Sequence, residues 1–238
     1  PSSSLRTWKL RKLYNNTDLR GKLQLLGHEF LYQTDDELLL HAYIVWGEKM
    51  LDELDGVFAF AIYDREQQIL FLARDRFGVK PLYYCVTNGG IVFASEIPPI
   101  LSVLSTKPTA NEHAIFDYLV FNRTDQTEQT FFTGIYKMQH GCCMTIDCKQ
   151  TCTKDNLPIV KWYDLALRVQ GQTIKKDKSE YMRLLTSAIQ KRLQGDLPWG
   201  VGLSGGLDSS AITSTVINIL KEADVHSISA VYGKESSA

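Results

Sequence analysis

A run of small and hydroxylated residues near the C-terminal end of the chain combines the features of an anion-binding turn. Residues 199–210 read Trp-Gly-Val-Gly-Leu-Ser-Gly-Gly-Leu-Asp-Ser-Ser, and an apolar pattern typical of a helix follows over 208–221. A strand-to-helix turn of this kind places backbone N–H groups at the positive end of the helix dipole, which favours phosphate. Two adjacent glycines remove the Cβ atoms that would hold the backbone away from an anion. The sequence therefore predicts a strand, an anion-binding turn and a helix N-terminus.

The predicted ligand of this turn is a nucleotide. The run lacks the lysine of the common phosphate-binding loop, and it resembles the pyrophosphate loop of the ATP pyrophosphatases, which adenylate a carboxylate or a carbonyl. The resemblance implies that residues 203–210 hold ATP, with Mg²⁺ beside Asp208. A tight turn without a ligand would explain Gly-Gly alone, but not the whole run. The residues assigned to the nucleotide are Leu203, Ser204, Gly205, Gly206, Asp208, Ser209, Ser210 and, at the end of the next predicted strand, Ala230.

Composition narrows the class of protein. The 238 residues suffice for one large domain or for two. A formal net charge of -1 and a charged fraction of 22% favour neither nucleic acid nor a membrane surface as partner. The odd number of cysteines and the adjacent pair at 142–143 argue against a secreted disulfide framework, so we expect reduced thiols and a cytoplasmic protein. Cys148 and Cys152 could be metal ligands, but no second pair completes a zinc site.

Strands and short helices are predicted to share the first 150 residues. We expect helices from Asn16 to about Gly27, from the cap Thr34 to Trp46, and over 112–120. Residues 56–64 alternate large and small apolar side chains, which predicts a strand buried on both faces. Further strands are expected at 69–73, 82–86, 91–94 and near 144–146, and one core made of Phe58, Phe60, Ile62, Leu70, Leu72, Leu82 and Phe93.

The remainder of the chain reads as a connection and a second domain. Residues 151–178 are polar with weak periodicity, which favours a linker. A helix capped by Ser179 and ended by Gly195 precedes the glycine turn, and a strand over 228–232 follows the next helix. Two strands joined through a helix predict a parallel pair, and a parallel sheet needs more strands than these. We therefore expect domains at 1–150 and 179–238, the first lacking its N-terminal part and the second cut short.

Three segments of the first domain resemble the glutaminase domain of class II glutamine amidotransferases: residues 55–64, 74–84 and 93–97. With the Ser-Gly-Gly-Leu-Asp-Ser-Ser run after them, their order resembles the glutamine-hydrolysing asparagine synthetases. The resemblance implies an α+β domain followed by an α/β one. The first is an Ntn-hydrolase-type αββα sandwich, and the second is the start of a parallel ATP-pyrophosphatase (adenine nucleotide alpha-hydrolase-like) domain. Without the resemblance, Asp75 and Arg76 would read as a surface ion pair.

The resemblance also implies a reaction and its substrates. Aspartate, ATP and glutamine or ammonia would give asparagine, AMP and pyrophosphate, with Mg²⁺ as the metal, and a homodimer is compatible with it. The family's nucleophile is an N-terminal cysteine whose own α-amino group acts as base. Residue 1 here is Pro, and the first cysteine, Cys85, falls in a predicted strand without a free amine. We therefore assign no catalytic residue.

The glutamine-binding motif is altered as well. The family's Asn-Gly-Glu-Ile-Tyr-Asn is replaced at 10–15 by Leu-Arg-Lys-Leu-Tyr-Asn. The oxyanion-hole residues thus become Leu10 and Arg11, and the glutamate that binds the substrate amine becomes Lys12. Asp35 alone keeps its expected place as an amine ligand, and its alternative role is to cap a helix.

Two explanations fit these departures. The chain is a fragment with a truncated or shifted beginning, which its abrupt C-terminal end favours, or the protein has lost glutaminase activity. The sequence favours an asparagine-synthetase-like, ATP-dependent amidating ligase whose glutaminase site is incomplete in this chain. The alternatives are an adenylating enzyme without glutaminase activity, similar to β-lactam synthetase, and a non-catalytic Ntn-type scaffold.

Overall fold

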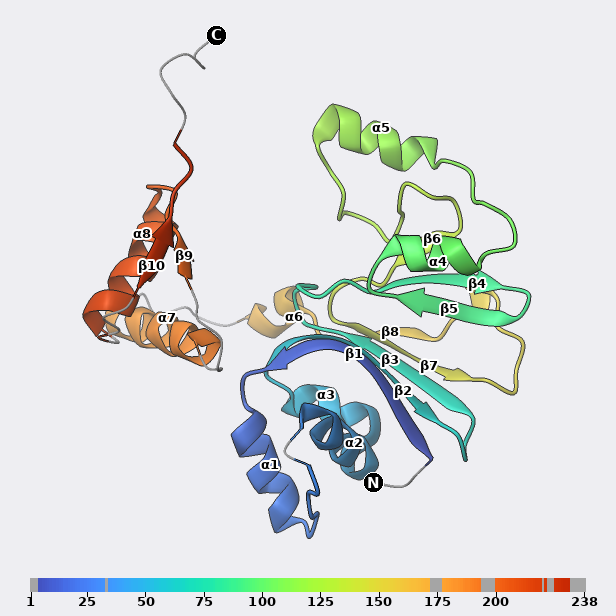
Figure 1. The fold of residues 1–238 in the computed structure, drawn as a ribbon, viewed down its shortest axis with the longest axis horizontal. Helices are drawn as coiled ribbons and strands as arrows, with labels where there is room; N and C mark the ends of the chain where they lie inside the picture. The colour runs from blue at the N-terminus through green and yellow to red at the C-terminus, as the bar shows by residue number, and fades with distance from the viewer. Residues whose placement is uncertain are drawn as a thin grey trace. The chain divides into compact units, whose positions relative to one another are not determined.

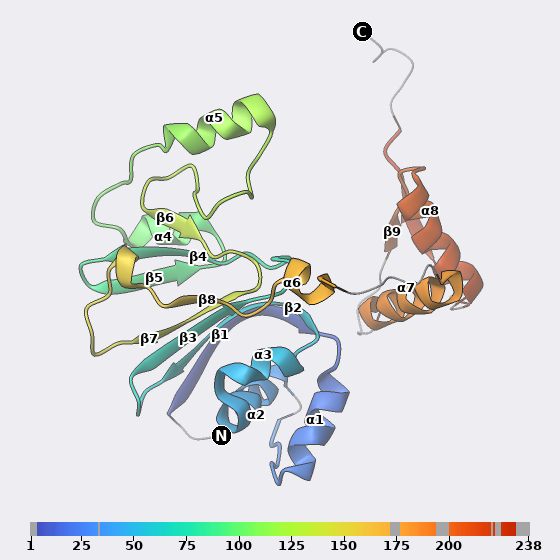
Figure 2. The same ribbon diagram turned by 180° about the vertical axis from the view of Figure 1, so that it is seen from behind.

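The chain forms two compact units, Pro1–Gln170 and Gly171–Ala238, and each is considered by itself. Figures 1 and 2 show the computed structural model from opposite sides, with the first unit in blue to yellow and the second in orange to red. The described residues are 4–32, 34–171, 177–193, 200–219, 221 and 225–231. Among them, no helix is long and apolar enough to cross a bilayer.

An antiparallel sheet of five strands is the centre of the first unit. The strand order is β1-β2-β3-β7-β8, and each neighbouring pair is antiparallel. The predicted strand over 56–64 is confirmed with the same bounds, and residues 65–68 form the turn that leads to the next strand. The strands are β1 (Leu5–Leu13), β2 (Gly56–Asp64), β3 (Ile69–Arg74), β7 (Cys142–Asp147) and β8 (Ile159–Lys161).

Helices and a second sheet cover the two faces of this sheet (Figures 1 and 2). One face carries α1 (Asn16–Leu25), α2 (Asp35–Trp46) and α3 (Met50–Glu53), with the short 3₁₀ turn η1 (Gly47–Lys49) before α3. The other face carries the sheet β5-β4-β6, on which α4 (Ile97–Val103) packs. The layer order is therefore αββα, as the resemblance implied. The second sheet consists of β4 (Tyr83–Thr87), β5 (Gly90–Ala94) and β6 (Ile135–Lys137), and α5 (Glu112–Phe121) precedes β6.

The side-chain alternation of β2 explains this layering. Its large residues Phe58, Phe60 and Ile62 are fully buried on the helix side, whereas Ala59 and Ala61 belong to the cluster between the sheets. Small residues on that face let the second sheet approach closely, and large ones on the other face fill the space under the helices.

The expectation of one common core is therefore wrong. Phe58, Phe60 and Ile62 pack with the helices in one cluster. Leu70, Leu72 and Leu82 form another cluster between the two sheets, with Phe93 half-buried against it. Successive strand residues point to opposite faces, so a sheet covered on both sides divides its apolar residues between two cores.

Residues 151–170 are part of the first unit rather than a linker. They form a 3₁₀ turn, η2 (Lys154–Asn156), the edge strand β8, and α6 (Leu165–Val169). Trp162 stacks on Phe58 with ring centroids 6.2 Å apart and donates its indole N–H to the Arg74 carbonyl at 3.2 Å. A three-residue strand and a single aromatic anchor are too short to produce a readable period, which is why the sequence indicated a linker.

The second unit contains a parallel strand pair, β9 (Gly200–Gly202) with β10 (His226–Ile228). Asp177 rather than Ser179 caps α7 (Lys178–Leu193), because its carboxylate accepts the backbone N–H of Ser179 at 2.9 Å. The helix expected at 208–221 is α8 (Leu207–Ser214) followed by a π-helical turn, η3 (Thr215–Ile219). Our expectations at Trp199, Gly195 and Tyr232 lie outside the described residues.

Candidate functional site

The turn between β9 and α8 is tied to the neighbouring strand at its start. The backbone N–H of Leu203 donates to the Ile228 carbonyl at 2.9 Å, and the Ser229 hydroxyl donates to the Leu203 carbonyl at 2.6 Å. Gly205 then takes a φ of +80°, in the left-handed region that glycine adopts without strain. The chain thus reverses above the strand ends and enters the helix with an exposed backbone at Gly205 and Gly206.

Two serine hydroxyls meet at the mouth of this turn. Ser204 Oγ lies 3.1 Å from Ser209 Oγ and accepts the backbone N–H of Gly206 at 3.4 Å. Ser209 Oγ also lies 3.1 Å from the Gly206 carbonyl, to which it donates. The hydroxyls and the N–H groups of the first helical turn therefore share one small, solvent-facing surface, and such a surface binds anions well.

Asp208 lies in the first turn of α8 but does not cap the helix. Gly206 is the N-cap, and Asp208 is the second residue of α8 and is exposed. Within the described residues its carboxylate has no hydrogen-bond or ion-pair partner, and no cluster of three or more His, Cys, Asp or Glu suited to a metal occurs there. A lone carboxylate fits Mg²⁺, which is commonly held by one or two carboxylates together with substrate phosphates.

Ala230 is exposed and lies two residues beyond the end of β10, the strand whose last residue is hydrogen-bonded to the loop at Leu203. The nucleotide residues predicted from the sequence therefore lie in one part of the second unit. Loop and strand end share one edge of the parallel pair, the edge where ligands of open α/β sheets bind.

The altered motif at 10–12 lies in a regular strand of the first unit. Leu10 pairs with Ala59, Arg11 with Phe58 and Lys12 with Val57 in the β1–β2 register. Lys12 is exposed, while the side chains of Leu10 and Arg11 fall outside the described residues. A continuous strand thus runs where the family pattern has its oxyanion-hole asparagine and glycine.

Asp35 has a role that the sequence did not indicate. Thr34 is the N-cap of α2, and its hydroxyl accepts the Glu37 N–H at 3.4 Å, so capping does not fall to Asp35. The Asp35 carboxylate instead accepts a hydrogen bond from the Asn16 side-chain amide at 2.8 Å. Asp35 therefore ties the start of α2 to the start of α1.

Asp75 is the most heavily bonded side chain of the segment 74–81. It is 1% exposed, and its carboxylate accepts four backbone N–H groups within one turn and the adjacent strand. These donors are Phe58 at 3.2 Å, Phe77 at 3.1 Å, Val79 at 3.0 Å and Lys80 at 3.0 Å. The surface-pair interpretation is therefore wrong, because a buried carboxylate organises the loop.

Arg74 completes this loop from the other side. The guanidinium donates to the carbonyls of Gly78 at 2.6 Å and Lys80 at 2.7 Å, and also to Met138. Burial lowers the pKa of Arg74, whereas the charge of Asp75 raises it. Gly78 has a φ of +66°, and a Cβ there would lie 3.1 Å from the Arg74 guanidinium, so the loop requires glycine. The sequence signal was present in Arg-Asp followed by glycine, but it does not reveal which way the carboxylate faces.

All five cysteines are free thiols, and they lie in the first unit. Cys85 is buried in β4, and burial raises its pKa, as burial also raises the pKa of Cys142. Burial, together with nearby negative charge from Glu48, raises the pKa of Cys143 to about 12. A buried thiol with a raised pKa is a poor nucleophile, so Cys85 does not provide one.

Comparison with protein-family models matches both units. Residues 11–156 match a model described as glutamine amidotransferase domain, and residues 180–238 match one described as asparagine synthase. A solved structure of glutamine phosphoribosylpyrophosphate amidotransferase from Bacillus subtilis matches with a TM-score of 0.45 and 13% identity. The match covers 99% of this chain and 48% of that chain. That similarity is too low to support any conclusion.

Curated relatives are similar over most of the chain. Asparagine synthetase (glutamine-hydrolyzing) 3 of Bacillus subtilis is 34% identical over 203 residues, covering 85% of this chain and 32% of that protein. Putative asparagine synthetase (glutamine-hydrolyzing) 2 of Methanocaldococcus jannaschii is 31% identical over 89% of this chain and 39% of its own length. Amidase chry2 of Gibberella zeae is 31% identical over 85% of this chain and 30% of its own. The chain spans about a third of the length of these relatives.

Proposed function

Because the chain belongs to the asparagine synthetase family, we propose that it serves an ATP-dependent amidation. Aspartate, ATP and a nitrogen donor would give asparagine, AMP and pyrophosphate. The observation that carries the proposal is the exposed turn at 203–210, whose hydroxyls and helix N–H groups point to one solvent-facing surface. The second unit is then the start of a parallel α/β domain of the ATP-pyrophosphatase type.

Each part of the nucleotide has a chemically suited partner in this turn. The backbone N–H groups of 205–209 would hold the pyrophosphate, and the hydroxyls of Ser204 and Ser209 would donate to the same oxygens. Asp208 would share a Mg²⁺ ion with the phosphates, and Ala230 would lie against the adenine. When bound with Mg²⁺, ATP would supply the adenylyl group that activates the acceptor carboxylate, with pyrophosphate as the leaving group, and these residues would bind and orient the nucleotide.

The experiment for nucleotide binding is calorimetric titration of the chain with ATP and Mg²⁺. Gly206→Val adds a branched side chain at a position where even a Cβ would lie 3.4 Å from Ser204 Oγ, so we expect at least about a tenfold loss of affinity. Gly202→Ala is the matched control, since nothing lies within 4 Å of a Cβ at that position. Equal affinity in the two variants would show that ATP binds elsewhere.

The nitrogen donor proposed for this chain is ammonia rather than glutamine. Lys12 reverses the charge at the position that binds the substrate amine, and a cation repels an ammonium group. Loss of one oxyanion-hole donor alone costs about 10²–10³ in rate. We expect no glutaminase activity, and thiol-sensitive ammonia release from glutamine would overturn this part of the proposal.

A second candidate is adenylation of a different carboxylate without any glutaminase step, similar to β-lactam synthetase. The substitutions at 10–12 favour it, because they remove glutamine chemistry and leave the nucleotide turn intact. Pyrophosphate exchange into ATP distinguishes the two in a protein carrying this chain. Exchange that depends on aspartate supports the ligase, and exchange that depends on another carboxylate supports the alternative.

A further inference from the structure

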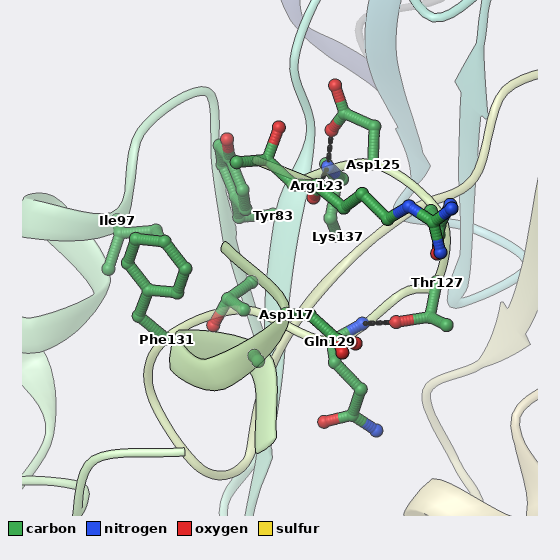
Figure 3. A pocket seen from close by; sticks show the side chains of 13 residues that line it. Tyr83, Ile97, Asp117, Arg123, Asp125, Thr127, Gln129, Phe131 and Lys137 are labelled. Atoms are coloured by element: carbon green, nitrogen blue, oxygen red, sulfur yellow. Dashed lines mark hydrogen bonds and ion pairs between the residues drawn. The ribbon is translucent and has the colours of Figure 1, made fainter. Parts of the chain in front are cut away.

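A pocket of about 350 Å³ lies in the first unit, between α5, the segment 123–131 and β6. Figure 3 shows the charged side chains of Lys137, Arg123 and Asp125 apart from the apolar side chains of Ile97 and Phe131, and Asp117 on α5 is a second carboxylate in the lining. The volume is within the range of small-molecule sites. The pocket contains no residue of the nucleotide turn or of the altered glutamine motif.

The charge at the floor of this pocket is a buried lysine. The Lys137 side chain is 9% exposed, and its ammonium donates to the Thr124 carbonyl at 3.0 Å and forms an ion pair with Asp125. Burial lowers the pKa of Lys137, and the charge of Arg74 lowers it further. An ammonium out of water requires an anion beside it, so this position calls for a carboxylate or an equivalent group.

The carboxylate that neutralises Lys137 comes from the solvent side. The Asp125 side chain is 80% exposed, whereas its partner is almost fully covered. Water can solvate the Asp125 carboxylate once it is released, but the buried Lys137 ammonium needs another anion in its place. Asp125 can therefore move into solvent only as a ligand carboxylate takes its position beside Lys137.

A second cation and an apolar wall define what that ligand would be. Arg123 is exposed at the rim, its guanidinium 5.2 Å from the ring of Phe121, and no acceptor for it occurs among the described residues. Ile97 and the 38% exposed ring of Phe131 form the opposite wall. We propose that this pocket binds a small organic carboxylate with an apolar body, whose carboxylate displaces Asp125 from Lys137 and is also reached by Arg123.

The first experiment compares a charged probe with its neutral counterpart. The 238-residue chain is titrated with 3-phenylpropionate and with 3-phenylpropionamide, and binding is followed by calorimetry and by the amide resonances of Gln129 and Phe131. We expect the carboxylate to bind about tenfold more tightly than the amide, because it gains hydrogen bonds to charged donors. Equal affinities, or shifts confined to other resonances, would overturn the proposal.

Variants test the displacement itself. Asp125→Asn removes the competing carboxylate and should tighten 3-phenylpropionate binding several-fold, whereas Asp155→Asn, an exposed aspartate outside the pocket, should leave it unchanged. Lys137→Met should abolish binding of 3-phenylpropionate. Arg123→Gln, at an exposed position, should weaken it. If Lys137→Met does not fold, the Arg123→Gln variant tests whether the pocket binds the carboxylate. Weaker or equal binding in Asp125→Asn would contradict the exchange.

Inorganic phosphate serves as the competing anion. We expect it to displace 3-phenylpropionate only weakly, because it cannot use the apolar wall of Ile97 and Phe131. Competition as strong as that of unlabelled 3-phenylpropionate would show a general anion site and overturn the assignment to organic carboxylates.

Discussion

Two turns of this molecule use similar residues for opposite purposes. The turn at 74–80 and the turn at 203–210 each follow a strand, each contain an aspartate, and each contain a glycine with positive φ, at Gly78 and Gly205. In the first, four backbone N–H groups converge on the buried Asp75 carboxylate. In the second, Asp208 faces solvent and the helix N–H groups face outward.

The difference separates a structural turn from a turn for which we propose anion binding, called the binding turn below. Both surround a place suited to an anion, but the first supplies that anion from its own chain and becomes part of the core. The second leaves the place open to solvent, so that an external anion can be bound and released. Whether the aspartate faces inward therefore distinguishes the two more reliably than the residue composition of the turn.

Among the substitutions that test this comparison, we expect the largest loss of stability in the structural turn. Asp75→Ala leaves four backbone N–H groups and the buried Arg74 without their anion, and we expect it to lower the free energy of unfolding of the first unit by about 3–5 kcal/mol. Urea denaturation of the 238-residue chain measures the change. A variant as stable as the wild type would mean that water replaces the carboxylate and that the turn is not held from within.

A smaller effect is expected at the anchor of residues 151–170. Trp162→Phe keeps an aromatic ring against Phe58 but removes the indole donor to the Arg74 carbonyl, and we expect a loss of about 1–2 kcal/mol in the free energy of unfolding. Tyr181→Phe, in the second unit and 64% exposed, is the control. Equal stability of the two variants would restore the linker interpretation of 151–170.

The first unit should also lose stability on mild acidification. His41 is 6% exposed, and its Nδ1 lies 2.7 Å from that of His28. Burial lowers the pKa of His41 from 6.5, and the charges of His28 and Arg20 lower it further, while Glu37 raises it. The folded state therefore disfavours the protonated His41 ring. The contribution of the neutral ring to the free energy of unfolding is complete above about pH 6.5 and is lost as the pH falls toward the lowered pKa of the folded state.

For one titrating group, the free energy of unfolding changes by at most about 1.4 kcal/mol per pH unit. Urea unfolding measured from pH 7.5 down to pH 5 reports it. His41→Gln should flatten the profile, while His113→Gln, at a side chain that is 87% exposed, should not. Parallel profiles for wild type and His41→Gln would place the acid sensitivity in another group.

The smallest effect is expected in the binding turn. Asp208→Ala should change the free energy of unfolding by no more than about 0.5 kcal/mol, since its carboxylate is exposed. The same variant should weaken ATP binding in the presence of Mg²⁺ more than in its absence. A destabilisation close to that of Asp75→Ala would remove the distinction between the two turns.

Sequence patterns predicted the elements whose signal is local. The strand at 56–64 follows from strict alternation, and the tight turn between β9 and α8 follows from adjacent glycines before a helical pattern. These features depend on neighbouring residues alone, so periodicity and turn chemistry are sufficient to find them.

The remainder depends on long-range contacts. Asp75 is buried because Phe58, 17 residues earlier, donates to it, and Trp162 is an anchor because Phe58 lies opposite it. The pocket above Lys137 likewise joins α5, a loop and a strand. A single sequence shows the polarity of such residues but not the partners that satisfy them.

The placement of the thiols allows the opening of the first unit to be followed separately from the second. The five cysteines all precede residue 171, and three of them, Cys85, Cys142 and Cys143, are buried with raised pKa values. Alkylation of these three requires the sheets to open, whereas Cys148 is exposed and reacts without opening. Mass spectrometry of the alkylated chain therefore measures how fast the first unit opens, from the alkylation of the buried thiols relative to that of Cys148. The second unit contains no cysteine and adds no signal.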